Sequence, residues 1–272
     1  MQTETNKGAA LITGASSGIG AVYADRLARR GYDLILVARN RERLDALARR
    51  LTQATGRSVE VIPADLNRDG DLAQIESKLR TDPRVSMLVN NAGFGATTPL
   101  LESDVERMDE MLALNVRALM RLTYSAVPGF VARGAGAIIN IASIVAIAPE
   151  LLNGVYGGSK AFVLAFTQSL QHELASKGVR VQAVLPGATA TEFWGIAGRP
   201  VEQLPSQIVM SAEDLVDAAL AGFDLGETIT VPSLPESSDW DTFEASRLVL
   251  QPKLSRSVPA HRYRPSRGGA PS

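Results

Sequence analysis

The amino-acid sequence predicts an α/β fold, a doubly wound parallel sheet of about seven strands with helices on both faces. Short apolar runs alternate with amphipathic segments, as where "AALITGA" is followed by "AVYADRLARRG". The predicted strands are apolar along nearly their whole length, so helices must cover both faces of the sheet. A chain of 272 residues has a suitable length for one such domain.

The alternation of strands and helices continues to residue 232. The predicted strands cover residues 9–15, 33–39, 58–66, 86–93, 136–143, 179–187 and 228–232. The predicted helices cover residues 21–31, 41–56, 71–80, 104–133, 156–177 and 211–220. Gly31 is a C-cap and Ser211 begins a capping sequence. Pro128 is expected to break or bend the long fourth helix.

Composition excludes several functional classes. The net charge of -1 gives no reason to expect a nucleic-acid partner or an anionic membrane. Without cysteine there is no disulfide, cysteine zinc site or cysteine nucleophile, and two distant histidines, His172 and His261, argue against a metal site. The amino terminus lacks the apolar core of a signal peptide, and residues 137–148 are too short an apolar run to span a bilayer. We therefore expect a cytoplasmic protein.

The carboxyl-terminal segment differs in composition from the rest. From Arg256 it reads "RSVPAHRYRPSRGGAPS", which contains Arg262, Arg264 and Arg267 and no acidic residue. We expect a single domain over residues 1–254, followed by a flexible basic tail over residues 255–272. The alternative is an arm that packs on a partner subunit or binds an anionic group.

The turn after the first strand has the composition of a phosphate-binding loop. "TGASSGIG" places three glycines between a strand and a helix, where the backbone can approach a pyrophosphate at the helix N-terminus. The alternative is an ordinary strand–helix loop, but the first βαβ unit is the context that a dinucleotide site requires. The predicted contacts from this turn are Gly14, Ser16, Ser17, Gly18, Ile19 and Gly20.

The end of the second strand indicates which dinucleotide binds. An NAD site usually has an acidic residue here for the ribose 2′-hydroxyl, whereas an arginine accommodates the 2′-phosphate of NADP. This chain has Arg39 and Asn40, with no carboxylate before Glu42. We therefore expect NADP (NADPH) rather than NAD, although these arginines are also typical of a solvated helix start. Asp65 and Leu66 after the third strand would border the adenine, and small residues after the fourth strand would line the cofactor path: Asn91, Ala92 and Gly93.

Four polar residues at the carboxyl side of the sheet suit carbonyl reduction. Tyr156 could protonate the developing alkoxide, but the free pKa of tyrosine, about 10, is high for this task. Lys160 lies four residues later, on the same helix face, and its ammonium should lower that pKa. Ser143 could hydrogen-bond the substrate oxygen, and Asn115 could hold a water that relays protons.

Together these motifs make the sequence resemble the short-chain dehydrogenase/reductase family, in its compact single-domain branch with a Rossmann-like fold. The resemblance covers residues 8 to about 232, and rests on "TGASSGIG", "NNAG", "YGGSK" and "PG" at 186–187. It implies that Tyr156 is the acid/base, that Lys160 lowers its pKa and binds the nicotinamide ribose, and that Ser143 orients the carbonyl. Asn115 would hold the relay water, Arg39 would favour NADP, and the nicotinamide and phosphates would meet Pro186, Gly187, Thr189 and Thr191.

The resemblance also implies a homodimer or homotetramer formed through the helices at 104–133 and 156–177. The expected partner is a small-molecule substrate, a hydrophobic ketone or aldehyde or the matching secondary alcohol, because the predicted pocket wall is apolar. A loop at about 188–210 would close over it, or would simply pack on the core as a flap. The predicted wall contains Phe94, Val145, Leu151, Phe193 and Trp194, with Ile144, Ile147, Leu152 and Ile196 as further candidates.

Two other functions share some of these features. A non-catalytic NADP-binding regulator would have the same fold, but would be expected to lack Ser143, Tyr156 or Lys160. A sugar-nucleotide epimerase or dehydratase would have different glycine spacing and a larger carboxyl-terminal domain.

The two glycines between Tyr156 and Lys160 are poor helix formers, each costing about 1 kcal/mol against alanine in a helix interior. We expect Gly157 to face a tight contact that excludes a side chain. Gly158 need not do so.

Overall fold

The structure, a computed structural model, describes residues 7–263. A parallel seven-stranded sheet has the order β3-β2-β1-β4-β5-β6-β7, so the predicted doubly wound architecture is confirmed. The order reverses between β1 and β4, which is where ligands bind in such sheets. The strands are β1 Ala9–Thr13, β2 Asp33–Ala38, β3 Val59–Pro63, β4 Val85–Asn90, β5 Gly136–Ile141, β6 Val179–Val184 and β7 Ile229–Thr230.

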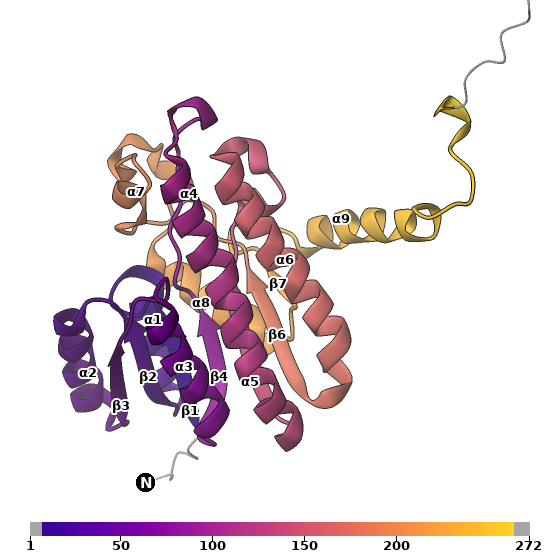
Figure 1. The fold of residues 1–272 in the computed structure, drawn as a ribbon. Helices are drawn as coiled ribbons and strands as arrows, with labels where there is room; N and C mark the ends of the chain where they lie inside the picture. The colour runs from indigo at the N-terminus through magenta and orange to yellow at the C-terminus, as the bar shows by residue number, and fades with distance from the viewer. Residues whose placement is uncertain (1–6, 264–272) are drawn as a thin grey trace, which may run out of the picture. The chain divides into compact units, whose positions relative to one another are not determined.

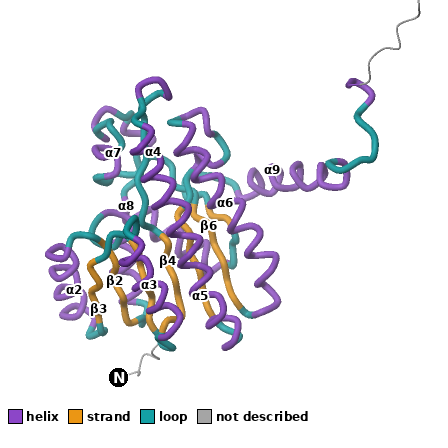
Figure 2. The backbone as a smooth tube through the Cα atoms, viewed as in Figure 1, coloured by secondary structure: helices purple, strands orange, loops and turns teal. Residues whose placement is uncertain are grey.

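Helices cover both faces of the sheet, and each face has its own apolar core (Figures 1 and 2). On one face α1, α2 and α8 pack around Tyr23, Leu44 and Leu220. On the other face α3, α5 and α6 pack around Leu72, Leu122 and Leu170. The helices are α1 Gly18–Arg29, α2 Arg41–Thr55, α3 Asp69–Thr81, α4 Val105–Leu112, α5 Leu119–Arg133, α6 Gly154–Leu174, α7 Phe193–Ile196, α8 Ala212–Leu225 and α9 Ser237–Leu250.

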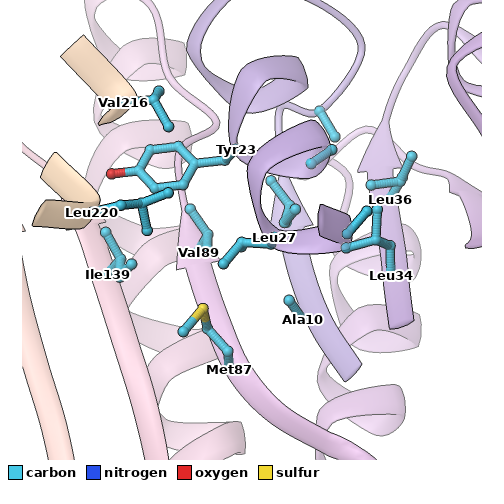
Figure 3. Close-up of a cluster of buried hydrophobic side chains, with 14 of the residues drawn as sticks. Ala10, Tyr23, Leu27, Leu34, Leu36, Met87, Val89, Ile139, Val216 and Leu220 are labelled. Carbon is cyan, nitrogen blue, oxygen red and sulfur yellow. The ribbon is translucent and has the colours of Figure 1, made fainter. Parts of the chain in front are cut away.

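One buried polar atom in the first core has no partner. Tyr23 is fully buried and lies beside Val216 and Leu220 of α8 (Figure 3). Its hydroxyl makes no hydrogen bond in the described part of the chain, and burial raises the pKa of this phenol far above its usual value. An unsatisfied buried hydroxyl costs stability.

The long helix expected over 104–133 is interrupted, but not where the sequence suggested. Pro128 lies inside the continuous helix α5, so the expected break near it is wrong. The carbonyl that loses its partner to this proline belongs to Tyr124, which is on the exposed side of the helix and can bond water. The interruption is a π-helical segment, Ala113–Ala118, between α4 and α5.

The observed boundaries of two other helices differ from the predicted ones, and hydrogen bonds and backbone conformation explain why. Helix α6 begins at Gly154, two residues before the prediction, because the Asn153 side chain accepts hydrogen bonds from the backbone N–H of Val155 (2.9 Å) and Tyr156 (3.4 Å). Helix α8 continues to Leu225 and ends at Gly226, which has φ 85°.

The chain divides into two compact units, residues 1–232 and 233–272, so the first ends before the predicted boundary at 254. The second unit contains α9, a helix that the sequence analysis did not identify, and none of its residues is buried. Of the predicted basic tail, residues 255–263 are exposed, while Arg264 and Arg267 lie outside the described residues. None of the described helices is long and apolar enough to cross a membrane.

Candidate active site

The turn between β1 and α1 is shaped by its glycines. Gly14 and Gly18 have φ of 65° and 52°, a conformation that favours glycine. A Cβ on Gly20 would lie 2.3 Å from the carbonyl oxygen of Gly14, and one on Gly14 would lie 2.9 Å from Cα of Ala92. Ser16, Ser17 and Ile19 are half-buried along the same turn. The turn is therefore a cradle of bare backbone at a helix N-terminus, as a pyrophosphate requires.

The start of the "NNAG" segment holds this turn in place. The Asn91 side chain donates to the carbonyl oxygens of Thr13 (2.9 Å) and Gly14 (3.2 Å). The backbone N–H groups of Asn91 and Ala92 both donate to the Thr13 hydroxyl, each at 3.0 Å. The Asn91 amide nitrogen is therefore occupied with the turn. Thr13, which the sequence analysis did not single out, joins β1 to the end of β4.

The residues expected at the adenosine end lie around the carboxyl ends of β2 and β3. Arg39 is exposed, and no hydrogen bond or ion pair engages its guanidinium among the described residues. Asn40 is the N-cap of α2, and its side chain accepts from the Arg43 N–H at 3.0 Å. Asp65 caps its own turn, accepting from the N–H of Asn67 at 3.1 Å, and Leu66 is buried. A free cation beside a glycine cradle fits a dinucleotide with a 2′-phosphate.

Three of the four predicted catalytic side chains meet at the carboxyl end of β5. Ser143, Tyr156 and Lys160 are all buried there. The Ser143 hydroxyl lies near the Tyr156 phenol, and it donates to the carbonyl oxygen of Pro186 at 3.3 Å. Lys160 donates to the carbonyl oxygen of Ile141 at 2.8 Å, and its Nζ lies 5.8 Å from the centre of the Tyr156 ring.

The electrostatics of this group differ from the expectation. Burial raises the pKa of Tyr156 to about 12, and the nearby Ser143 hydroxyl acts against that rise. Burial alone lowers the pKa of Lys160 to about 8. Desolvation thus outweighs any effect of the ammonium on the phenol, because a buried tyrosine is disfavoured as the phenolate. Tyr156 is a protonated acid at neutral pH.

Asn115 lies in the π-helical segment and reaches the same group. Its side chain donates to the carbonyl oxygen of Phe94 (2.9 Å) and to the Ser159 hydroxyl (3.1 Å), and accepts from the Phe94 N–H (3.1 Å). Both amide hydrogens are used, so a relay water would have to meet an oxygen of Asn115. A Cβ on Gly93 would lie 2.8 Å from Oδ1 of Asn115 and 3.7 Å from Nζ of Lys160, which places "NNAG" beside the catalytic residues.

The loop after β6 connects the catalytic group to the glycine turn. Pro186 accepts a backbone hydrogen bond from Ile144 (3.0 Å), and half-buried Gly187 accepts one from the Thr189 hydroxyl (3.2 Å). The carbonyl oxygen of Thr189 accepts from the Trp194 indole at 3.0 Å. Thr191 reaches the glycine turn, where a Cβ on Gly18 would lie 3.1 Å from its methyl group.

An apolar cluster lies against Tyr156, and it contains part of the predicted pocket wall. Val145, Phe94, Leu152 and Phe193 belong to it, and the Phe193 and Tyr156 rings are 5.7 Å apart. Trp194 is buried beside Phe193 but lies outside the cluster, and Leu151 is 56% exposed. Ile147 and Ile196 are also exposed.

Four residues of this cluster were not predicted: Ala96, Met108, Met111 and Val155. The methionines lie three residues apart on α4, one helix turn, so their spacing was a usable signal. Gly95 is also part of this wall, because a Cβ there would lie 2.4 Å from the ring of Phe193.

The two glycines of α6 differ as expected. Gly157 is buried, and a Cβ on it would lie 3.0 Å from Cβ of Pro149 and 3.2 Å from its Cα. Gly158 is exposed and has open space around it. The clearance at Gly157 brings the segment Pro149–Leu151 close to the start of α6.

Solved structures resemble this chain over nearly its whole length. A short-chain dehydrogenase from Sphingobium yanoikuyae in complex with NADPH is 49% identical, with a TM-score of 0.92, covering 94% of this chain and 100% of that one. A bulky-bulky ketone specific alcohol dehydrogenase from Comamonas testosteroni is 43% identical, with a TM-score of 0.88, covering 96% and 100%.

Sequence comparison adds a more distant relative and the family. A very-long-chain 3-oxoacyl-CoA reductase from Anas platyrhynchos is 36% identical over 191 residues, 68% of this chain and 60% of that protein. The chain therefore spans less than two thirds of the length of this relative. The family model of the short chain dehydrogenases matches residues 8–199, well over half of the chain. The chain belongs to the short-chain dehydrogenase/reductase family of oxidoreductases.

Proposed function

We propose that this oxidoreductase uses NADP(H) to interconvert a hydrophobic ketone or aldehyde and the matching secondary alcohol. One observation carries the proposal: a buried, protonated Tyr156 lies near Ser143 on one side and against an apolar cluster on the other. A polar acid at the wall of an apolar pocket suits a substrate with one carbonyl and little other polarity.

The cofactor would lie across the switch point of the sheet. The glycine turn would meet the pyrophosphate, and exposed Arg39 would meet the 2′-phosphate. Gly93, Thr189 and Thr191 would line the path from there to Lys160. Bound NADPH supplies the hydride. The Sphingobium relative, solved with NADPH, supports this choice of dinucleotide.

The chain's own residues would manage the proton. Ser143 would donate a hydrogen bond to the carbonyl oxygen, where negative charge develops. Tyr156 would give its proton to that oxygen, and the Lys160 ammonium would stabilise the phenolate left behind. Asn115 would position this group through its bonds to Phe94 and Ser159. A purely regulatory protein would have no use for these three side chains buried at the end of one strand.

The substrate would be bulky as well as apolar. Ala96, Met108, Met111 and Val145 are all apolar, and methionine side chains adapt to different shapes. The Comamonas relative is described as specific for bulky-bulky ketones, which agrees with such a wall.

The chain would act as a homodimer or homotetramer through α5 and α6. Tyr124 of α5 is 69% exposed and stacks on Phe166 of α6, with ring centres 6.3 Å apart. Phe162 continues this aromatic row at 5.5 Å. Sedimentation of wild type and Tyr124→Glu would test this interface, with a smaller particle expected for the variant.

The enzyme test is NADPH oxidation with a panel of bulky ketones, in wild type and Tyr156→Phe. We expect turnover in wild type and a loss of about 10³-fold in the variant, the usual scale for a general acid. Tyr263→Phe, at an exposed position in the second unit, is the matched control and should keep full activity. Retained activity in Tyr156→Phe, with NADPH still bound, would overturn the assignment.

A further inference from the structure

An ion pair joins the loop after β6 to the start of α2. Nη1 of Arg43 lies 2.7 Å from Oε2 of Glu192, 149 residues away in sequence. Arg43 stands in the first turn of α2, and Glu192 immediately precedes α7. Neither residue has a part in the carbonyl chemistry described above.

The same carboxylate also reaches the glycine turn. Ser17 and Glu192 line the same hollow, and the hydrogen bond from Arg43, with a smaller effect from Ser17, lowers the pKa of the Glu192 carboxyl. Thr191 packs its methyl group against Gly18 one residue earlier. Glu192 thus spans the N-termini of α1 and α2, the two places where a dinucleotide puts its pyrophosphate and its adenosine phosphate.

The ion pair joins the loop to α2 at the surface, while Thr191 joins it to α1 and Ala190 to Met210. The side chains of Arg43 and Glu192 are 50% and 59% exposed, so they lie at the rim and not in the core. A hollow of about 540 Å³ opens beside them, lined in part by Ala21, Arg50 and Glu213. Because open space adjoins the loop here, the ion pair rather than core packing holds it to α2.

We propose that Glu192 and Arg43 form a strap that closes the loop after β6 over the bound dinucleotide and slows its release. The inference rests on the proposed binding of NADP(H) and adds two residues to that site. Arg43 uses only Nη1 for Glu192, so Nε and Nη2 remain as donors for a cofactor phosphate. One guanidinium therefore holds both the loop and the nucleotide.

The strap predicts the direction in which loss of the Glu192 charge changes the release rate of NADPH. If Glu192 merely occupied the phosphate position, removing its charge would tighten binding of NADPH. If the strap holds the loop closed, removing it would speed release. An exposed ion pair of this kind changes a rate by about two- to fivefold, and more at low ionic strength.

The test measures release of NADPH and NADH from Glu192→Gln, Arg43→Gln and the double variant by stopped-flow fluorescence, with equilibrium affinity from calorimetry. Glu213→Gln and Arg50→Gln are matched controls, since both residues line the same hollow and make no ion pair among the described residues. We expect about two- to fivefold faster release of NADPH from Glu192→Gln. Arg43→Gln should release NADPH faster still, because it also loses the donors to the phosphate, and the double variant should match Arg43→Gln. Release of NADH from Glu192→Gln should also be faster than from wild type, because the strap does not need the 2′-phosphate.

The outcomes separate the strap from the proposed function. Slower release or tighter binding in Glu192→Gln, or independent effects that multiply in the double variant, would overturn the strap alone. Effects equal to those of Glu213→Gln and Arg50→Gln would do the same. A wild-type chain that binds neither dinucleotide would refute both the cofactor assignment and the strap.

Discussion

The two ends of the site are built from different materials. The cofactor end uses bare backbone and rim charges: Gly14 and Gly20 approach other backbone closely, and Arg39 and Arg43 are exposed. The catalytic end uses polar side chains in the interior, and burial moves the pKa values of Tyr156 and Lys160 in opposite directions. Rim charges cost the fold little, whereas buried titratable groups lower its stability.

This difference predicts which substitutions should change ligand binding and which should change the stability of the fold. Changes to rim charges should alter which ligand binds and leave stability nearly unchanged. Changes to buried polar side chains should alter stability, and those at the catalytic end should alter activity as well, often in the opposite direction. Four experiments test that division, in order of decreasing effect.

Arg39→Asp should move cofactor preference by about 100-fold toward NADH, because a charge-assisted contact to phosphate is worth about 1.5–3 kcal/mol and aspartate would repel the 2′-phosphate. The measurement is the ratio of kcat/KM with NADPH to that with NADH. The melting temperature should stay within about 1 °C of wild type. Arg57→Asp, on the loop after α2, is the control, and an unchanged ratio in Arg39→Asp would remove this residue from the site.

Lys160→Met should stabilise the chain by about 2 kcal/mol at pH 7 while abolishing turnover. The folded pKa of about 8, against 10.5 for the free group, means that burial of the ammonium costs about 3 kcal/mol at 1.36 kcal/mol per pKa unit. Loss of the hydrogen bond to the carbonyl oxygen of Ile141 reduces this gain in stability by about 1 kcal/mol.

The stability difference between Lys160→Met and wild type should depend on pH in a definite direction. Between pH 8 and 10.5 the unfolded chain binds more protons at Lys160 than the folded chain does, so wild-type stability rises with pH through that window. The advantage of Lys160→Met should be full below pH 8 and shrink toward pH 10.5. Urea unfolding at pH 7 and pH 10 measures it; an advantage that grew with pH would contradict the depressed pKa.

Tyr23→Phe should stabilise the chain by about 1–2 kcal/mol without changing activity, because it removes a buried hydroxyl that has no partner. Thermal unfolding and the standard assay report the two properties. Tyr32→Phe, at a half-buried position, is the control and should change stability less. A destabilised Tyr23→Phe would indicate that the hydroxyl is bonded to an internal water.

Gly158→Ala should stabilise α6 by up to about 1 kcal/mol, since alanine is the better helix former and the space is open. Gly157→Ala should destabilise, because its Cβ would press on Pro149 at 3.0 Å. Urea unfolding of both variants gives the comparison. Equal effects at the two positions would show that the contact with Pro149 is easily relieved.

Local patterns were enough to predict the fold. All seven strands and their parallel arrangement follow from apolar runs and turn glycines, whereas the strand order, with its reversal between β1 and β4, came only from the structure. Arg39 and the glycine turn were recognisable because backbone sites leave their signature in consecutive residues.

What escaped prediction depends on contacts that are distant in sequence. Nothing near Arg43 indicates Glu192, and nothing near Tyr156 indicates that desolvation dominates its pKa. Leu151 has the composition of a pocket residue, yet its short turn leaves it exposed. Helix α9 has no buried face, so the pattern that identifies most helices is weak there.

The π-helical segment Ala113–Ala118 changes the direction in which the side chains of α4 point relative to those of α5. Each residue of an α-helix advances the direction of the side chains by about 100°, and a π turn absorbs one extra residue. Removing one residue there would restore a regular helix and rotate α4 by that angle relative to α5. Met108 and Met111 would then leave the apolar cluster while the sheet stayed intact. One surplus residue thus sets which face of α4 packs in the apolar cluster beside Tyr156.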